Sequence, residues 1–551
     1  MATGQRCKRD AMVRYCSARP FGAVRPGAAG LETPAGWYRS CHPTYAVRDV
    51  TLASEATESW TSARARALDH SLLRGVAWTA AAKWASQALS WVSWLIVARL
   101  LSPEDYGLVG MAAIYLGLVT LLSEFGLGTA VLAIRELSVE QISQLNGLAA
   151  LSGLASLLLS CAVAIPLGQF FHAPQLPLVV AAMSTTFVIT SFKTVPFALL
   201  QRELRFKTLA GIDLGQAVIL AVCMVGFAVA GFRYWTLVCG AVLGALISTG
   251  AVLRLRHLPL AWPRRESLKH AMTLSCDVLV SRLCWYASAN ADFLVAGRVL
   301  GKAALGFYNV GWTLASVPVD KITTLVAQVT PAFFSAVQSD PPAMRRYVLR
   351  ITEGIALITF PLALGLALVA RDFVLAVLGT KWEATVAPLR LLAAYAAVRS
   401  IMPLLPQVLQ IIRDARFEMW RMVAAAVVMP TCFYVSGNRW GTIGLAAAWL
   451  LVDPIIALPL YRRVFSRIAL SPKAYLLALW PALSGTALMA AAVLAVGASS
   501  GRAWTPSLRL AVQVAAGVIS YGLACLLLHR ERLKAFFELV RAARGRPGGS
   551  P

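Results

Sequence analysis

Ionisable side chains lie in the middle of long apolar segments of this chain, and these residues are the ones most able to perform chemistry. A charge placed in hydrocarbon costs several kcal/mol, so such a side chain usually faces a wet cavity or a partner of opposite charge. Four basic residues are predicted to bind substrate in a cavity by neutralising a diphosphate: Lys83, Lys193, Arg282 and Arg399. Three acidic residues are predicted to balance these charges or to take up a coupling cation: Glu124, Asp292 and Asp320.

Several of these charges also have a structural interpretation. Asp277 and Arg282 lie close together near the start of an apolar segment, where an ion pair or snorkelling to the interface would explain them. Asp320 and Lys321 are adjacent and could compensate each other's charge. Asp453 precedes a proline and could satisfy backbone groups freed at a helix break. The sequence leaves these structural alternatives open beside the functional ones.

Motifs of soluble enzymes are absent from the sequence. It contains no phosphate-binding loop of the GxxxxGK[ST] kind, no HExxH, and no acidic loop suited to a metal-bound nucleotide sugar. The ten cysteines form no CxxC pair and lie at no metal-binding spacing from the six histidines. The longest loop predicted on the outer side, about 371–384, is short for a membrane glycosyltransferase, polymerase or ligase. We therefore expect neither catalysis nor a metal or cofactor.

The elements that carry these charges are predicted to be membrane-spanning helices. Hydrophobic residues make up 58% of the chain and charged residues only 14%, and the mean hydropathy is +0.66. A helix needs about 20 apolar residues to cross a bilayer. About fourteen segments meet this length, which predicts an all-α polytopic membrane protein. They lie near 76–98, 107–132, 146–169, 176–200, 209–231, 233–253, 271–297, 305–330, 347–370, 385–412, 419–437, 441–461, 474–498 and 508–528.

Basic residues in the loops predict the orientation of the chain. Alternate loops, with their span edges, carry 19 Lys and Arg residues against 8 in the opposite set, and both basic termini join the richer side. The positive-inside rule then places both termini in the cytoplasm. The net charge is +25, but the basic residues sit in short loops and at the termini. This distribution favours contact with anionic lipid and argues against a nucleic-acid partner.

An internal repeat divides the membrane region. The segment Leu95–Leu101, followed by Gly107, is echoed by Leu294–Leu300, followed by Gly306, 199 residues later. Six helices per unit give both units the same orientation, so we expect two six-helix bundles in parallel repeat plus two C-terminal helices. The predicted organisation is a basic, disordered cytoplasmic extension (1–75), the N-terminal six-helix bundle (76–253), a basic cytoplasmic linker (254–270), the C-terminal six-helix bundle (271–461), two additional spans (462–528) and a basic cytoplasmic tail (529–551).

Four motifs in order resemble those of a known family. They are Leu100–Gly107 (LLSPEDYG), Leu199–Lys207, Asn290–Tyr308 and Leu378–Glu383. Together they make the chain similar to the bacterial polysaccharide-transport flippases of the multidrug/oligosaccharidyl-lipid/polysaccharide exporter superfamily. The motifs lie mostly at span ends, where they are expected to fix turns and helix contacts.

The resemblance implies a transporter of the bacterial inner membrane with a central cationic cavity. Its implied substrate is an undecaprenyl-diphosphate-linked oligosaccharide, moved to the outer leaflet for O-antigen, capsule or exopolysaccharide assembly. The implied partners are this lipid-linked oligosaccharide, membrane lipids, a polysaccharide polymerase and a chain-length regulator. Two other functions stay open at this point: a cation-coupled multidrug exporter, and an integral-membrane polysaccharide polymerase or ligase.

Overall fold

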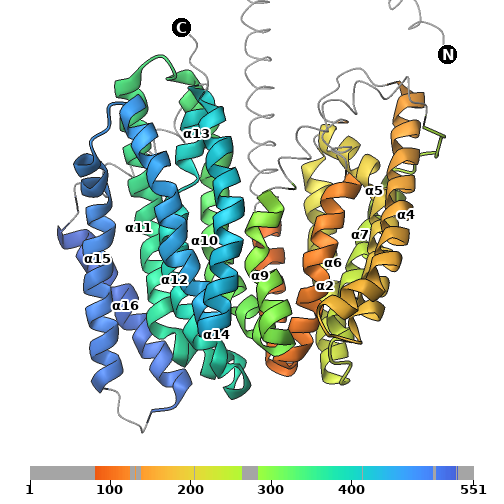
Figure 1. Cartoon of the computed structure of the whole chain (residues 1–551), viewed down its shortest axis with the longest axis horizontal. Coiled ribbons are helices and arrows are strands. Elements are labelled where there is room, and N and C mark those ends of the chain that lie inside the picture. Colours follow the sequence, from red (N-terminus) through yellow and green to blue (C-terminus); the bar gives the residue numbers. More distant parts are fainter. Residues whose placement is uncertain are drawn as a thin grey trace, which may run out of the picture. The chain divides into compact units, whose positions relative to one another are not determined.

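The fold is given by a computed structural model (Figure 1). Helices dominate the described part of the chain, in which no β-strand occurs. The predicted extension 1–75 and nearly all of the tail 529–551 lie outside the described residues. The structure describes residues 78, 81–124, 131, 138–203, 205–263, 283, 285–412, 414–499, 504–528 and 530.

The helices up to residue 255 form the first helix group, drawn in orange to yellow in Figure 1. Its first helix covers residues 81–100. The others are α2 (Pro103–Glu124), α4 (Val139–Phe170), α5 (Leu176–Arg202), α6 (Phe206–Val229) and α7 (Trp235–Leu255). Helix α4 packs against α5, and α7 packs against both α5 and α6.

The helices from residue 291 onward form the second helix group, drawn in green to blue. Helices α10, α11, α12 and α14 pack around one another, and α15 and α16 pack on α11. The elements are α9 (Ala291–Val295), the π-helical turn η1 (Ala296–Leu300), α10 (Gly301–Ala336), α11 (Pro341–Phe373), the π-helical turn η2 (Val374–Leu378), the 3₁₀ helix η3 (Thr380–Thr385), α12 (Val386–Ile401), α13 (Leu404–Ile411), α14 (Ala415–Arg467), α15 (Pro472–Ser499) and α16 (Pro506–Leu528).

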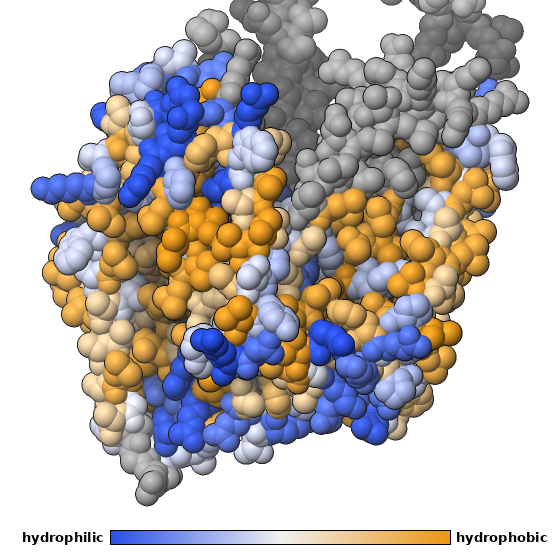
Figure 2. Space-filling model, in the orientation of Figure 1, coloured by the Kyte–Doolittle hydropathy of each residue, from blue (hydrophilic) through white to orange (hydrophobic). Residues whose placement is uncertain are grey.

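Ten helices within the described residues are long and apolar enough to cross a membrane. Helix α14 contains two of the predicted spans, because Gly441 adopts φ 61° and bends the chain between them. Helix α10 is not among the ten; it contains Asp320 and Lys321 near its middle. Figure 2 shows hydrophobic residues over the middle of the visible face and hydrophilic residues gathered toward its ends. The chain is thus an all-helical, multi-pass membrane protein, while the count of fourteen spans stays a prediction.

Local sequence explains where the helices begin. Ser138 caps α4: its hydroxyl accepts a hydrogen bond from the Gln141 amide, and the Gln141 side chain accepts one from the Ser138 amide. Ser102 and Asp105 make the same reciprocal arrangement at the start of α2. The acidic residue of the LLSPEDYG motif therefore fixes a helix start, as expected for a motif at a span end.

Contacts between the two helix groups gather near the repeated segments. Helix α2 packs along α10. The indole nitrogen of Trp382 donates a hydrogen bond to the Ala98 carbonyl at 2.9 Å, and Arg99 donates one to the Ala376 carbonyl at 3.0 Å. The repeat of Arg99 in the second group is Arg298, which contacts His172 of the first group. The segment duplicated in sequence is thus a place where the two groups meet.

Candidate functional site

A first charged cluster lies within the first helix group. Lys193 on α5 donates a hydrogen bond from Nζ to the hydroxyl of Ser248 on α7 at 2.7 Å. Asp213 on α6 interacts electrostatically with both Lys193 and Lys83. Lys193 is half-buried and Lys83 is exposed. The structure therefore brings two of the predicted substrate-binding lysines to one acidic residue.

A second charged cluster lies within the second helix group. Arg399 on α12 forms an ion pair with Asp320 on α10. The guanidinium of Arg399 also lies 5.4 Å from the centre of the Trp312 ring. This cation–π contact, together with the ion pair, fixes the direction of the guanidinium. The sequence had suggested the neighbouring Lys321 as the charge partner of Asp320. In the structure its ion-pair partner is Arg399, which lies on another helix.

Asp292 is the most enclosed of the predicted residues. It lies at the start of α9 and none of its surface is exposed. The hydroxyl of Tyr308 and the indole nitrogen of Trp449 donate hydrogen bonds to its Oδ2 atom, at 2.7 and 2.8 Å. Trp449 comes from α14, so Asp292 ties α9 to α10 and α14 through its carboxylate. A buried carboxylate held by neutral donors suits the predicted role of charge balance or cation coupling.

Aromatic rings connect Asp292 to the ion pair. The ring centre of Trp449 lies 5.5 Å from that of Trp312 and 5.3 Å from that of Tyr395. The Tyr395 hydroxyl donates a hydrogen bond to Asp453 at 3.0 Å. Asp453 in turn interacts electrostatically with Arg399. Asp453 therefore belongs to a side-chain network. Satisfying backbone groups at the following proline is not its only interaction.

Two members of this network escaped the sequence analysis. Arg421 and Glu418 lie inside α14, and Arg421 donates from Nε and Nη2 to the two oxygens of Glu418 at 2.8 and 2.6 Å. Each side chain is only 10% exposed. The loop-charge count included Arg421 as a basic residue at the edge of a predicted span, and the structure places it near the start of α14, which begins at Ala415. The spacing of three between opposite charges was the signal that would have identified the pair.

Two predicted site residues cannot be placed in either cluster. Glu124 is the last residue of α2, and its side chain is not among those described. Arg282 lies outside the described residues, as does Asp277. Among the described side chains, no hydrogen bond or ion pair joins Lys83 or Lys193 to Arg399, Asp320 or Asp292. The predicted charges thus form two clusters, one in each helix group.

The chemistry available to the clusters is ionic. Lysine and arginine side chains bind phosphate oxygens, with arginine favouring two-point contacts. The second cluster adds carboxylates and aromatic faces, which can hold a cation. Within the described part of the chain, no group of three His, Cys, Asp or Glu side chains is arranged to hold a metal ion.

Comparison with known proteins identifies the family. The polysaccharide biosynthesis protein family matches residues 96–387, which is more than half of the chain. The chain belongs to this family. Its sequence is 24% identical over 421 residues to the lipopolysaccharide biosynthesis protein WzxC of Escherichia coli K12, covering 74% of this chain and 84% of WzxC.

Two further relatives come from other bacteria. The succinoglycan biosynthesis transport protein ExoT of Rhizobium meliloti is 23% identical over 485 residues, which cover 87% of this chain and 97% of ExoT. The teichuronic acid biosynthesis protein TuaB of Bacillus subtilis is 24% identical over 338 residues, which cover 60% of this chain and 69% of TuaB. The similarity therefore extends well beyond the four motifs.

Solved structures establish the fold alone. The lipid II flippase MurJ, in a structure described as inward closed, superposes with a TM-score of 0.66 at 12% identity, covering 83% of this chain and 99% of MurJ. An inward-facing multidrug resistance transporter of the MATE family superposes with a TM-score of 0.53 at 15% identity, covering 70% of this chain and 96% of that chain. The chain therefore shares its fold with MurJ and with this MATE-family transporter.

Proposed function

We propose that this protein is a transporter that moves an undecaprenyl-diphosphate-linked oligosaccharide from the cytoplasmic to the outer leaflet of the bacterial inner membrane. The observation that carries the proposal is membership of the polysaccharide biosynthesis family by a chain with a MurJ-like fold. The product would serve O-antigen, capsule or exopolysaccharide assembly. No covalent chemistry is needed, because the substrate is moved and not altered.

The charged clusters support a role for specific residues. Lys83 and Lys193 in the first helix group and Arg399 in the second are the cations we propose to neutralise the diphosphate, with Arg282 as a further candidate. Asp292 and Asp320, with Glu124 as a further candidate, would balance these charges or carry a coupling cation. The polar glycan would occupy the water-filled path, while the polyprenyl tail stays in lipid.

Alternating access provides the proposed mechanism. The two helix groups would rock against each other, so that the path opens first to the cytoplasm and then to the outside. The loop charges predict that both termini lie in the cytoplasm, and in that orientation Arg99 and Arg298 would lie at the outer ends of their helices. Rocking would then have to separate the contacts of Arg99 and Trp382 that join the groups.

A cation-coupled multidrug exporter is the second candidate. It is favoured by the second cluster, where Asp292 lies among Trp449, Tyr395 and Trp312, since acidic and aromatic side chains bind organic cations. The lysines of the first cluster argue against it. A membrane polymerase or ligase would instead need catalytic residues in an external loop, and the sequence offers only short ones.

Reconstitution separates these functions. Purified protein in liposomes is given a fluorescent polyprenyl-diphosphate oligosaccharide in one leaflet, and its appearance in the other leaflet is measured by access of a membrane-impermeant glycosidase. We expect the labelled oligosaccharide lipid to be transferred. We also expect that an anionic lipid without the glycan does not inhibit this transfer. In cells lacking the protein, lipid-linked repeat units should accumulate on the cytoplasmic side. Normal outward exposure of the glycan in those cells, or efflux of drugs alone by the liposomes, would refute the proposal.

A further inference from the structure

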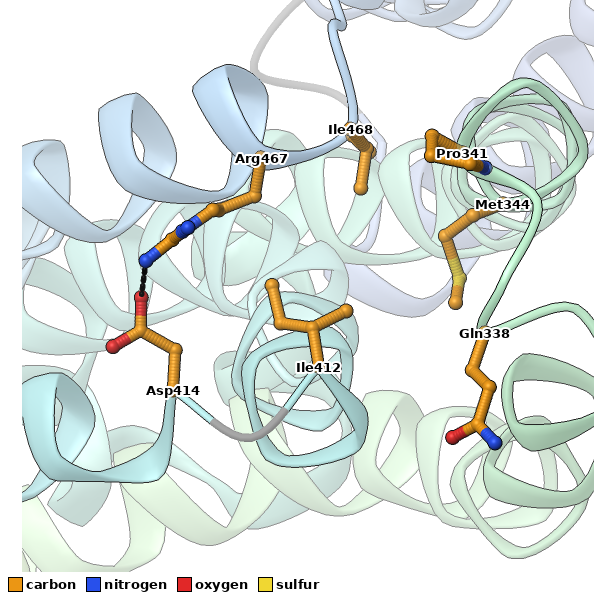
Figure 3. Close-up of a pocket in the computed structure, with 7 residues that line it drawn as sticks. All are labelled: Gln338, Pro341, Met344, Ile412, Asp414, Arg467 and Ile468. Atoms are coloured by element: carbon orange, nitrogen blue, oxygen red, sulfur yellow. Dashed lines mark hydrogen bonds and ion pairs between the residues drawn. The ribbon is translucent and has the colours of Figure 1, made fainter.

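A pocket of about 290 Å³ lies at one end of the second helix group (Figure 3). It is formed where α11 begins, where α13 passes into α14, and where α14 ends. Arg467 and Asp414 are joined on one side of the pocket, Met344, Ile412 and Ile468 form an apolar wall, and Gln338 and Pro341 complete the lining. The pocket therefore combines a charged edge with an apolar wall, and it is separate from both charged clusters of the candidate site.

Two guanidinium groups converge at the charged edge. The Nε atom of Arg463 and the Nη2 atom of Arg467 donate to the same oxygen of Asp414, at 2.8 and 3.2 Å. Arg463 also lies 5.6 Å from the ring centre of Phe417. Two positive charges face one negative charge, so the edge keeps a net positive charge, and its guanidiniums are already held in place. A guanidinium has five N–H donors, so each retains donors for an oxyanion.

More positive charge surrounds the pocket. Arg345 donates a hydrogen bond to the carbonyl of Ala469, next to the pocket residue Ile468. The side chains of Arg463 and Arg467 are 43% and 51% exposed, so a ligand can reach them. The ends of α11, α14 and α15 at this end of the group carry further exposed basic residues: Arg346, Arg350, Arg462 and Lys473. By the loop-charge rule this end lies at the cytoplasmic leaflet.

We propose that this pocket binds the headgroup phosphate of an anionic phospholipid of the cytoplasmic leaflet. Arg463 and Arg467 contact the phosphate oxygens through charge-assisted hydrogen bonds, while Met344, Ile412 and Ile468 contact the glycerol and the first acyl carbons. The apolar wall favours a lipid over free phosphate, because free phosphate gains nothing from apolar contact. The site goes beyond the proposed function and does not depend on which substrate is transported.

The test uses full-length protein purified in detergent and titrated with dioctanoyl phosphatidylglycerol, dioctanoyl phosphatidylcholine or inorganic diphosphate. The readout is the saturable rise of the thermal unfolding midpoint. We expect phosphatidylglycerol to bind at least tenfold more tightly than the other two. The double variant Arg463→Gln/Arg467→Gln should lose at least tenfold in apparent affinity for phosphatidylglycerol. The control Arg254→Gln/Arg439→Gln removes two exposed arginines elsewhere and should bind as the unsubstituted protein does.

A second measurement needs no variant. A phosphatidylglycerol analogue with a photoreactive group on its first acyl carbons is cross-linked to the unsubstituted protein, and the modified peptides should map to residues 338–344, 412–417 or 463–468. Equal affinity for phosphatidylcholine, binding by inorganic diphosphate that is as tight as the lipid's, or cross-links confined to other helices would each overturn the proposal. Liposome transport by the double variant separates the two proposals, since loss of lipid binding with transport retained leaves the proposed function intact.

Discussion

Gly107 of α2 lies against the backbone of Lys302 of α10, so closely that a Cβ atom on this glycine would stand 1.7 Å from the Lys302 carbonyl oxygen. Gly306 meets Pro103 in the same way, with a Cβ-to-carbonyl distance of 1.9 Å. Lys302 follows Pro103 by 199 residues, and Gly306 follows Gly107 by the same interval. The two copies of the repeated segment therefore contact each other reciprocally, as two units related by a pseudo-twofold axis would.

Replacing Gly107 by Ala is predicted to force α2 and α10 apart. The methyl group would meet a backbone carbonyl, which cannot rotate away as a side-chain tip could. We expect a loss of about 3 kcal/mol, the upper end of what overpacking usually costs, together with loss of glycan export. Thermal unfolding and export in a deletion strain measure the two effects.

The matched control is Gly215→Ala in α6, where a Cβ atom would meet nothing within 4 Å. This change should leave export intact and stabilise the helix by up to about 1 kcal/mol. Normal stability and export in the Gly107→Ala variant would show that the close α2–α10 contact is not required.

Removing a proposed substrate-binding cation is predicted to reduce transport. Lys193→Ala and Arg399→Ala should each lower liposome flipping at least tenfold, because each removes a positive charge from a partly buried site that we propose to hold the diphosphate. Arg399→Lys should restore part of the activity, since it keeps the charge but loses the planar guanidinium over Trp312. Unchanged flipping by Lys83→Ala, Lys193→Ala and Arg399→Ala together would refute the assignment even if the family function holds.

Trp449→Phe is predicted to destabilise the second helix group. The substitution removes the indole donor from buried Asp292 and leaves a carboxylate oxygen with one hydrogen bond fewer. Weakening a buried polar contact costs about 1–3 kcal/mol. Denaturant unfolding of the purified protein measures the loss. Trp480→Phe serves as the control, because Trp480 is 60% exposed, and it should change stability by less than about 0.5 kcal/mol. Equal stability of the two variants would contradict the structural role of Asp292.

The thermal stability of the protein is predicted to depend on pH through the ionisation of Asp414. Asp414 lies between α13 and α14, and the hydrogen bond from Arg463, aided by the charges of Arg463 and Arg467, holds the pKa of the Asp414 carboxyl below its usual range. A lowered pKa in the folded state stabilises the protein fully above the unfolded value, about 3.9. That contribution is lost as the pH falls below 3.9 and through the folded pKa.

The thermal unfolding midpoints of the unsubstituted protein and of Asp414→Asn provide the measurement, taken at one scan rate between pH 7 and pH 3. The unsubstituted protein should have the higher midpoint at pH 7, and the difference should begin to shrink below about pH 4, where the Asp414 carboxyl of the unfolded chain becomes protonated. A difference that grows as the pH falls would show that the ion pairs of Asp414 do not stabilise the fold.

Much about this protein follows from its sequence alone. Apolar segments of bilayer length determine that it is a helical membrane protein, because in lipid a spanning segment must satisfy its own backbone hydrogen bonds. The LLSPEDYG segment and its echo around Gly306 indicate the family and the duplicated architecture. The cost of burying charge also singled out Lys193, Asp292, Asp320 and Arg399, and each of these side chains has a polar or charged partner in the structure. Their roles in transport stay a prediction.

Only the tertiary structure decided which charges meet. Lys193 and Ser248 are 55 residues apart, and Arg399 and Asp320 are 79 apart. Helices that are apolar on all sides carry no amphipathic stripe, so the sequence does not tell which face points inward or toward which neighbour. The rotation of each helix is fixed by packing, through contacts such as that of Gly107 with Lys302. That packing divides the predicted charges into two clusters and adds Glu418 and Arg421 to one of them.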